Sequence, residues 1–177
     1  MTRWVALLRG VNVGGGNRLA MADLRATVAS LGHTNVATYI QSGNVVFDAD
    51  LDDEPMLVAT LSNALSMRHG LAVPVVARTR QQLIEVAARH PDVGGEIAPK
   101  FLHVQFLSAE PDLSRAATLD PVACLPDRWS LIGREIYTTY PNGSGRSKLT
   151  GEVLERALQV TATARNLNTV EALVALC

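Results

Sequence analysis

The stretch Val73-Pro-Val-Val-Ala-Arg-Thr-Arg-Gln-Gln-Leu83 aligns without a gap on Val160-Thr-Ala-Thr-Ala-Arg-Asn-Leu-Asn-Thr-Val170. The first, fifth and sixth residues are identical, and the apolar residues Leu83 and Val170 fall at the same place. Each stretch has a β-rich run followed by a helical pattern, which predicts a strand that leads directly into a helix. A shared strand-to-helix geometry without common descent would produce the same match, so the order of the surrounding elements carries more weight for a duplication.

That order is predicted twice along the chain. In the first half, strand-like runs cover residues 4–8, 35–40, 44–47 and 73–77, and helical patterns cover 21–31 and 55–69. In the second half, the strands are 101–107, 129–132, 135–140 and 160–164, and the helices are 113–119 and 149–158. A further helix follows each set, over 80–90 and 170–177. The order βαββαβ is that of the ferredoxin-like fold, whose helices cover one face of an antiparallel sheet.

We therefore predict an α+β protein with two ferredoxin-like βαββαβ units in tandem, each followed by an extra helix. Residues 91–100 are rich in glycine and proline and are predicted as the linker. This places the first unit and its helix at 1–90 and the second unit with its C-terminal helix at 101–177. A chain of 177 residues suits two small units packed together.

Composition restricts the class of protein. Hydrophobic residues make up 47% and charged residues 19%, as in ordinary globular proteins. The 16 Lys and Arg are matched by 17 Asp and Glu, which argues against a general nucleic-acid binder without excluding a local basic patch. No apolar run approaches the roughly 20 residues that span a bilayer, and no signal peptide is recognised, so a cytoplasmic protein is predicted. Cys124 and Cys177 lie in no metal or redox motif and are predicted as unpaired thiols.

The loop at residues 10–18 is the first candidate site, because it lies between a predicted strand end and a helix start, where free N–H groups favour anions. Gly14 and Gly15 would let the main chain approach a ligand, and Arg9, Asn12 and Asn17 could supply donors. The loop matches neither GxGxxG nor a P-loop. The alternative is a connection whose glycines serve turn geometry alone.

Two other polar segments lie at predicted strand ends. The segment 140–148 contains glycines that permit a nest of N–H groups, together with the cations Arg146 and Lys148, and its alternative is a solvated basic loop. In the segment 165–169, the planar guanidinium of Arg165 suits a carboxylate or phosphate. Asn166 could bind a ligand or simply cap the last helix.

Metal binding and catalysis have weaker signals. The acidic run at 48–54 lacks the spacing of an EF-hand, and the four histidines form neither HxH nor HExxH pairs, so no metal site is predicted. His103 alternates with Phe101 and Gln105 and is expected to point away from the core. No catalytic residue or cofactor can be assigned, and whether the protein is an enzyme stays open.

Three motifs resemble those of an uncharacterised bacterial family, domain of unknown function 1697. They are Arg9-Gly-Val-Asn-Val-Gly-Gly15, Thr38-Tyr-Ile-Gln-Ser-Gly-Asn-Val-Val46 and Thr163-Ala-Arg-Asn-Leu-Asn-Thr169. The similarity spans essentially the whole chain, and the third motif departs from the family at Leu167, where a tryptophan is usual. The resemblance implies two ferredoxin-like units and brings no established activity with it.

The leading hypothesis is a small-molecule binding protein for an anionic ligand, nucleotide-like or carboxylate. Its site would gather the glycine-rich loop, the turn with Gln41, Ser42 and Asn44, and the polar strand ends at Lys148, Arg165 and Asn166. The alternative is a non-catalytic module that binds RNA or a protein through an open sheet face. The chain would act as a monomer, or as a homodimer joined through sheet edges.

Overall fold

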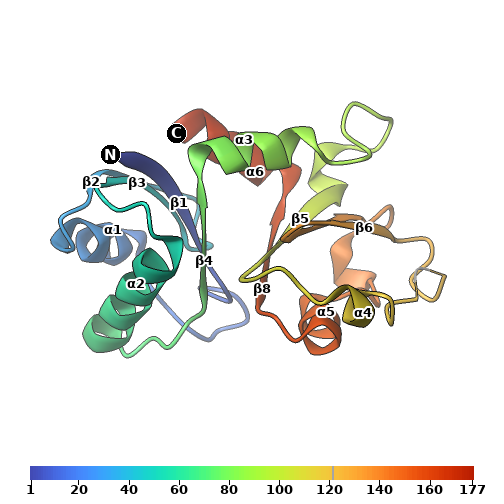
Figure 1. Cartoon of the computed structure of the whole chain (residues 1–177), viewed down its shortest axis with the longest axis horizontal. Helices are drawn as coiled ribbons and strands as arrows, with labels where there is room; N and C mark the ends of the chain where they lie inside the picture. Colours follow the sequence, from blue (N-terminus) through green and yellow to red (C-terminus); the bar gives the residue numbers. More distant parts are fainter. Residues whose placement is uncertain (121) are drawn as a thin grey trace. The chain divides into compact units, whose positions relative to one another are not determined.

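A computed structural model of the chain describes residues 1–120 and 122–177. The chain divides into two compact units, which are described separately here. Unit 1 comprises Met1–Ile84 and Ala172–Cys177, and unit 2 comprises Glu85–Glu171. Each unit has one four-stranded antiparallel sheet (Figure 1).

Unit 1 is built on the sheet β2-β3-β1-β4. Its elements in chain order are β1 (Thr2–Leu8), α1 (Met21–Ser30), β2 (Thr34–Tyr39), β3 (Asn44–Ala49), α2 (Glu54–His69) and β4 (Val75–Thr79). Helix α3 (Arg80–Ala88) follows β4 directly. The order of the strands and the two helices between them confirm a ferredoxin-like unit.

Unit 2 repeats this plan on the sheet β6-β7-β5-β8. It contains the 3-10 helix η1 (Pro99–Phe101), β5 (Leu102–Leu107), α4 (Leu113–Ala116), β6 (Arg128–Ile132) and β7 (Glu135–Thr139). The chain continues through the 3-10 helix η2 (Ser144–Arg146), α5 (Gly151–Leu158) and β8 (Ala162–Asn166). Helix α6 (Leu167–Leu176) begins in unit 2, and its residues from Ala172 onward belong to unit 1. The predicted tandem of two ferredoxin-like units is therefore confirmed. None of the helices in the described residues is both long and apolar enough to cross a membrane.

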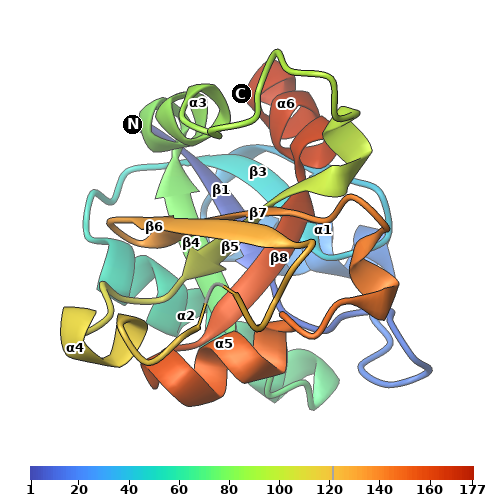
Figure 2. The same cartoon turned by 90° about the vertical axis from the view of Figure 1, so that its right-hand side faces the viewer.

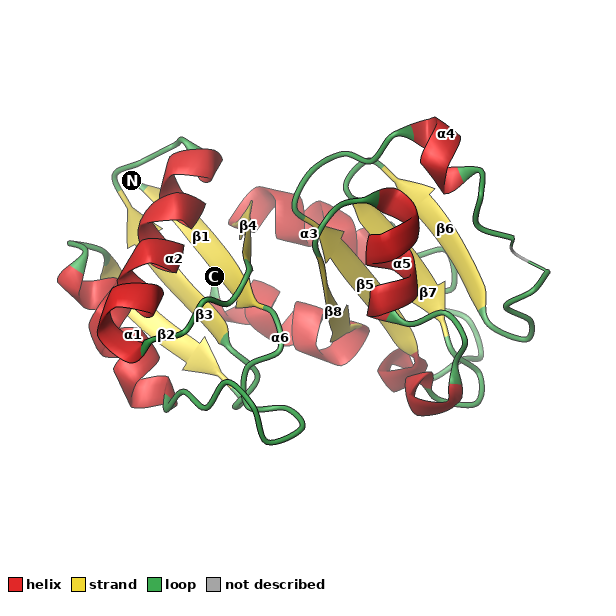
Figure 3. Ribbon diagram, turned by 90° about the horizontal axis from the view of Figure 1, so that it is seen from below, coloured by secondary structure: helices red, strands yellow, loops and turns green. Residues whose placement is uncertain are grey.

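In unit 1, α1 and α2 cover one face of the sheet (Figure 3). Leu24 of α1 and Leu57 of α2 pack in one core cluster with Trp4 and Phe47 of the sheet. Helix α2 begins where the Asp53 carboxylate accepts from the Met56 N–H at 2.8 Å, with a proline in its first turn.

In unit 2, α4 and α5 lie on the same side of the sheet (Figure 2). Leu154 and Leu158 of α5 pack with Leu107, Ile136 and other apolar side chains in a second core cluster. The Thr150 hydroxyl caps α5 by accepting from the Val153 N–H at 3.3 Å.

The aligned stretches keep the same hydrogen bonds in both units. Arg78 lies opposite Val5 of the central strand, and Arg165 lies opposite Val104. The Nη1 of each arginine donates to the carbonyl of the residue before it at 2.7 Å.

The residue after each arginine caps the helix that follows, α3 in one case and α6 in the other. The Thr79 hydroxyl accepts from the Gln82 N–H at 3.3 Å, and the Asn166 side chain accepts from the Thr169 N–H at 2.9 Å. A capping role for Asn166 is therefore confirmed. The match extends from sequence to side-chain geometry, which supports a duplication.

The ends of the central strands are also held alike. The Arg9 N–H donates to the Pro74 carbonyl at 2.9 Å, and the Ser108 N–H donates to the Thr161 carbonyl at 2.9 Å. Leu8 N–H binds the Gly43 carbonyl at 2.8 Å, as Leu107 N–H binds that of Arg134 at 2.9 Å.

The segment after α3 is fastened to β6 and β7 within unit 2. The buried His90 ring lies edge-on to Tyr137, its Nε2 is 3.3 Å from the Thr138 carbonyl, and its Nδ1 accepts from the Asp92 N–H at 3.2 Å. Because Nδ1 is an acceptor, the ring is the neutral tautomer with its proton on Nε2. Burial lowers the pKa of His90 below its ordinary value.

The alternation predicted that His103 points away from the core, and the structure shows that this prediction was wrong. Its ring packs edge-on against the buried Tyr140 at 5.1 Å between centroids, and its Nε2 lies 3.1 Å from the Lys100 carbonyl. The alternation of side chains along β5 predicts which residues share one face of the sheet. It does not predict which face the helices cover, because both faces of this strand carry polar and apolar side chains.

Gly43 provides a test of the β2–β3 turn. A Cβ at this position would lie 2.8 Å from the Leu8 Cβ, and φ is +72°, so Gly43→Ala combines a clash with a left-handed backbone. We expect the free energy of unfolding to fall by about 2 kcal/mol in urea denaturation. Gly16→Ala is the matched control, because nothing lies within 4 Å of its added Cβ and its φ is not left-handed. Equal losses in both variants would contradict this account.

One buried histidine, His90, and two half-buried ones, His33 and His103, predict acid sensitivity. Burial lowers the pKa of His33, His90 and His103, so each folded pKa lies below its unfolded value. Their contribution to stability is present above the unfolded pKa of about 6.5 and is lost as the pH falls toward the folded values. Urea denaturation at pH about 7.5 and about 5.5 should give a smaller free energy of unfolding at the lower pH. His90→Gln should reduce this difference, and an unchanged difference would rule out His90 as a contributor.

Candidate functional site

The glycine-rich loop of unit 1 is held by the side chain of Asn12. Its Nδ2 donates to the carbonyls of Leu19 and Gln41, both at 2.8 Å, and its Oδ1 accepts from the Leu19 N–H at 3.0 Å. One amide therefore joins the loop, the approach to α1 and the β2–β3 turn. The structure brings the predicted residues Asn12 and Gln41 together, with the Asn12 side chain bonded to the protein's own main chain.

Asn17 and Asn44 also bond to neighbouring main chain. Asn17 Nδ2 donates to the Gly10 carbonyl at 3.3 Å. Asn44 is 0% exposed, and its Nδ2 donates to the Tyr39 carbonyl and the Ser42 hydroxyl, both at 3.1 Å. These side chains shape the loop and the turn.

The remaining predicted residues of unit 1 are more accessible. Arg9 is half-buried, and Gly14 and Gly15 are exposed, with nothing within 4 Å of an added Cβ at either glycine. The main chain at these two glycines is therefore open to solvent.

In unit 2, Arg165 is 8% exposed, and its Nη1 donates to the Thr163 hydroxyl at 2.9 Å as well as to the Ala164 carbonyl. Burial lowers its pKa to about 10, so the guanidinium stays charged at neutral pH. Asn166 serves as the cap of α6. Neither residue is among those that surround Lys148.

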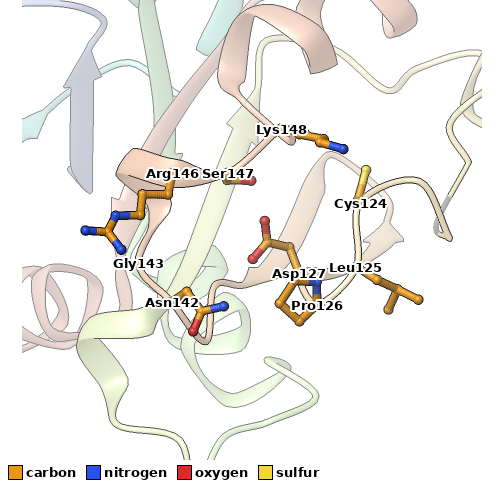
Figure 4. Close-up of a pocket in the computed structure, with 9 residues that line it drawn as sticks. All are labelled: Cys124, Leu125, Pro126, Asp127, Asn142, Gly143, Arg146, Ser147 and Lys148. Carbon is orange, nitrogen blue, oxygen red and sulfur yellow. The ribbon is translucent and has the colours of Figure 1, made fainter.

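Lys148 lines a pocket of about 220 Å³ in unit 2 (Figure 4). Two segments form the pocket, one before β6 and one between β7 and α5. The lining residues are Cys124, Leu125, Pro126, Asp127, Asn142, Gly143, Arg146, Ser147 and Lys148.

A carboxylate lies deep in this pocket. Asp127 is 6% exposed, and its side chain points into the hollow between the two segments (Figure 4). Its own N–H donates to the Cys124 carbonyl at 2.9 Å, which holds the turn before β6. No described residue donates a hydrogen bond to its carboxylate.

The cations of the pocket are on its outer side. Arg146 and Lys148 are exposed, and the Lys148 side chain extends toward Cys124 while Arg146 extends outward (Figure 4). Within the described residues, neither cation forms an ion pair with Asp127. The pocket thus has cations at its mouth and an anion in its interior.

Cys124 is a thiol rather than a thiolate at neutral pH. It is not in a disulfide, and burial raises the pKa of its thiol, with Asp127 and Asp120 adding to the effect. A protonated thiol is a poor nucleophile, so Cys124 contributes polarizable surface to the pocket.

The loop between β7 and α5 has its two ends tied together by Tyr140. The Tyr140 hydroxyl donates to the Leu149 carbonyl at 3.0 Å and lies 3.3 Å from Gln105 Nε2, which donates to it. Ser147 Oγ accepts from the Leu149 N–H at 2.8 Å. These bonds fix the position from which Lys148 reaches the pocket.

A second hollow of about 190 Å³ in unit 2 lies beside His90 and Asp92. Its carboxylate is already engaged, because Asp92 accepts from Arg128 Nη2 at 2.8 Å and from the Thr139 hydroxyl. These bonds lower the pKa of Asp92, Thr139 most strongly. These bonds hold the segment after α3 in place, and they occupy the Asp92 carboxylate and the Arg128 guanidinium with each other.

Sequence reasoning identified Lys148 and its loop, but it predicted Cys124 only as an unpaired thiol and did not single out Asp127. Both precede β6 in a stretch without periodic pattern, and only the fold brings them against residues 142–148. Among the described residues, no group of three or more His, Cys, Asp or Glu side chains could hold a metal ion.

The sequence profile of a family described as "Protein of unknown function (DUF1697)" matches residues 1–137. The chain belongs to this family. The matched region of the DUF1697 profile includes Asp127 and ends before Lys148. No similar protein is found among the curated proteins.

A solved structure shares the fold of this DUF1697 protein. It is described as the structure of conserved bacterial protein SP0830 from Streptococcus pneumoniae, with a TM-score of 0.71 and 21% sequence identity. The similarity covers 99% of this chain and 98% of the other. At this level of identity, the likeness shows a common fold.

The contribution of the Asn12 hydrogen bonds to stability can be tested by mutation. Asn12→Ala removes three hydrogen bonds and leaves the Leu19 N–H unsatisfied, so we expect a loss of about 1 to 2 kcal/mol in the free energy of unfolding, measured in urea. Asn17→Ala is the control, since it changes the same residue type in the same loop and removes one bond of 3.3 Å. If the free energy of unfolding falls no more in Asn12→Ala than in Asn17→Ala, the Asn12 hydrogen bonds do not stabilise the fold.

Proposed function

We propose that the protein binds a small anionic molecule, with a phosphate or carboxylate group, in the pocket of unit 2. The observation that carries this proposal is the position of Lys148 and Arg146 at the mouth of one hollow of about 220 Å³. Both side chains present several N–H donors, and guanidinium in particular matches the geometry of carboxylate and phosphate oxygens. The predicted anionic ligand is retained, and its proposed location is the pocket around Lys148.

The size of the pocket limits the ligand. A hollow of about 220 Å³ is below the roughly 300 Å³ at which pockets for drug-sized ligands begin. The ligand is therefore a small metabolite rather than a dinucleotide or a polymer. Because both cations are exposed, solvent and salt screen their attraction, and modest affinity is expected at physiological ionic strength.

Unit 1 has less to offer a ligand. The amides of Asn12, Asn17 and Asn44 bond to main-chain carbonyls of the protein itself. The proposal is one of binding, because the thiol of Cys124 has a raised pKa and does not supply an activated nucleophile.

Calorimetric titration at low ionic strength tests this proposal, with inorganic phosphate, propyl phosphate and propionate as probes. The chain has only two lysines, Lys100 and Lys148, which makes the control direct. Lys148→Ala should weaken binding of each anion by about three- to tenfold, because one charged donor is lost at an exposed site. Lys100→Ala should leave binding unchanged, since that ammonium lies 4.9 Å from the centroid of the Phe101 ring and away from the pocket.

Added salt should weaken binding in the wild type more than in Lys148→Ala, because the lysine charge is then already absent. Absence of binding for all three anions would overturn the proposal. Equal affinities in Lys148→Ala and Lys100→Ala would overturn the assignment to this pocket.

A further inference from the structure

Asp127 differs from the other aspartates of the chain, all of which lie in the described residues. It alone is buried, at 6% exposure. A carboxylate that leaves water loses hydration, and the loss is costly unless donors replace the water. A buried carboxylate is therefore expected to have the best set of hydrogen-bond partners in the chain.

Donors are instead found on the more exposed aspartates. Asp48 accepts from Asn35 and Arg3, and Asp92 accepts from Arg128 and Thr139. Asp53, Asp112 and Asp120 each accept from a main-chain N–H at 2.8 Å. Among the described residues, nothing donates to the carboxylate of Asp127.

Charge compensation is also missing at short range. Lys148 and Arg146 line the same pocket, yet neither forms an ion pair with Asp127 within the part of the chain that the structure describes. Asp127 points into the hollow from one segment, and the cations come from the other (Figure 4). The pocket thus has two cations, Lys148 and Arg146, at its mouth and the Asp127 carboxylate in its interior.

We infer that Asp127 accepts a hydrogen bond from the ligand itself, so that the pocket selects small molecules that carry a hydrogen-bond donor as well as an anionic group. This inference rests on the proposed function, since the anionic group of the ligand must lie at Lys148 and Arg146. The donor is a hydroxyl, as in a polyol phosphate or hydroxy acid, or an ammonium group, as in an amino acid. A bare anion would satisfy the cations and be repelled by Asp127.

The physical basis is a two-point contact with opposite signs. The anion of the ligand is attracted to the mouth, and its donor binds the Asp127 carboxylate, which receives no hydrogen bond from the described residues. A hydrogen bond to a charged acceptor is among the stronger ones in proteins, and leaving such an acceptor unpaired is costly. Selectivity therefore arises from both the attraction of the donor and the rejection of ligands that lack one.

Two matched ligand pairs test the inference by calorimetric titration. Glycerol 3-phosphate and propyl phosphate differ in the hydroxyl groups, and β-alanine and propionate differ in the ammonium group. The wild type should bind at least one donor-bearing member about tenfold more tightly than its partner. The pair that shows the larger ratio identifies the donor as hydroxyl or ammonium.

Asp127→Ala should shift the two kinds of ligand in opposite directions. The donor-bearing ligand loses its acceptor and binds more weakly, whereas propyl phosphate and propionate lose a repulsive charge and bind more tightly. Asp127→Asn keeps the shape of the side chain and should also tighten binding of the bare anions, and it serves if the alanine variant fails to fold. Glu152→Gln is the control, because it removes a carboxylate charge from an exposed position of α5 in the same unit.

A reduction of affinity for every ligand in both Asp127 variants would indicate a structural role and overturn the inference. Equal binding of paired ligands by the wild type, with the Lys148 dependence intact, would also overturn it while leaving the proposed function in place. If no anion binds at all, both proposals fail together.

Discussion

The Tyr140 hydroxyl donates to the Leu149 carbonyl at 3.0 Å, and this bond joins the two ends of the loop that lines the pocket. Tyr140 is 1% exposed and belongs to the core cluster of unit 2. Burial raises the pKa of its hydroxyl above the ordinary value, so the group remains a donor at any physiological pH. The loop that carries Arg146 and Lys148 is thereby attached at its base to the buried core of the unit.

This attachment explains how a polar loop can hold a site. Loops are mobile unless buried side chains fix their ends, and sites on rigid elements keep their geometry best. Here Tyr140 directly follows the strand β7, and the strand β5 supplies Gln105, whose Nε2 donates to the same hydroxyl. The position of Lys148 relative to Asp127 therefore depends on the sheet rather than on the loop alone.

The two units share a frame and differ in what their loops do. The arginines Arg78 and Arg165 occupy equivalent places and make the same bond, as do the caps Thr79 and Asn166. In unit 1, by contrast, the long loop after β1 is closed by the Asn12 side chain, which bonds to main-chain groups. A duplicated frame with unlike loops is what divergence after duplication produces, since loops tolerate change and the frame does not.

Sequence pattern was sufficient for the frame because periodicity and glycine turns are local properties. The Val73–Leu83 stretch and its counterpart predicted equivalent strand-to-helix junctions, and the structure has them down to single hydrogen bonds. The role of Asn12 could not be foreseen, because an amide that binds a ligand and one that binds main chain look the same in a sequence. Its partner Gln41 comes from a distant turn, and only folding brings the two together.

Asp127 is the more instructive case. Natural sequences tend to satisfy every local rule except at functional sites, where an unfavourable group is retained for what it does. The asparagines of unit 1 follow the rule that polar groups near the core find partners, and so do the more exposed aspartates of both units. Asp127 breaks it in a pocket whose mouth is cationic, where a ligand would supply the missing donor. In the inferred complex, the donor of the ligand would bind the one aspartate that receives no hydrogen bond from the described residues although its side chain is buried.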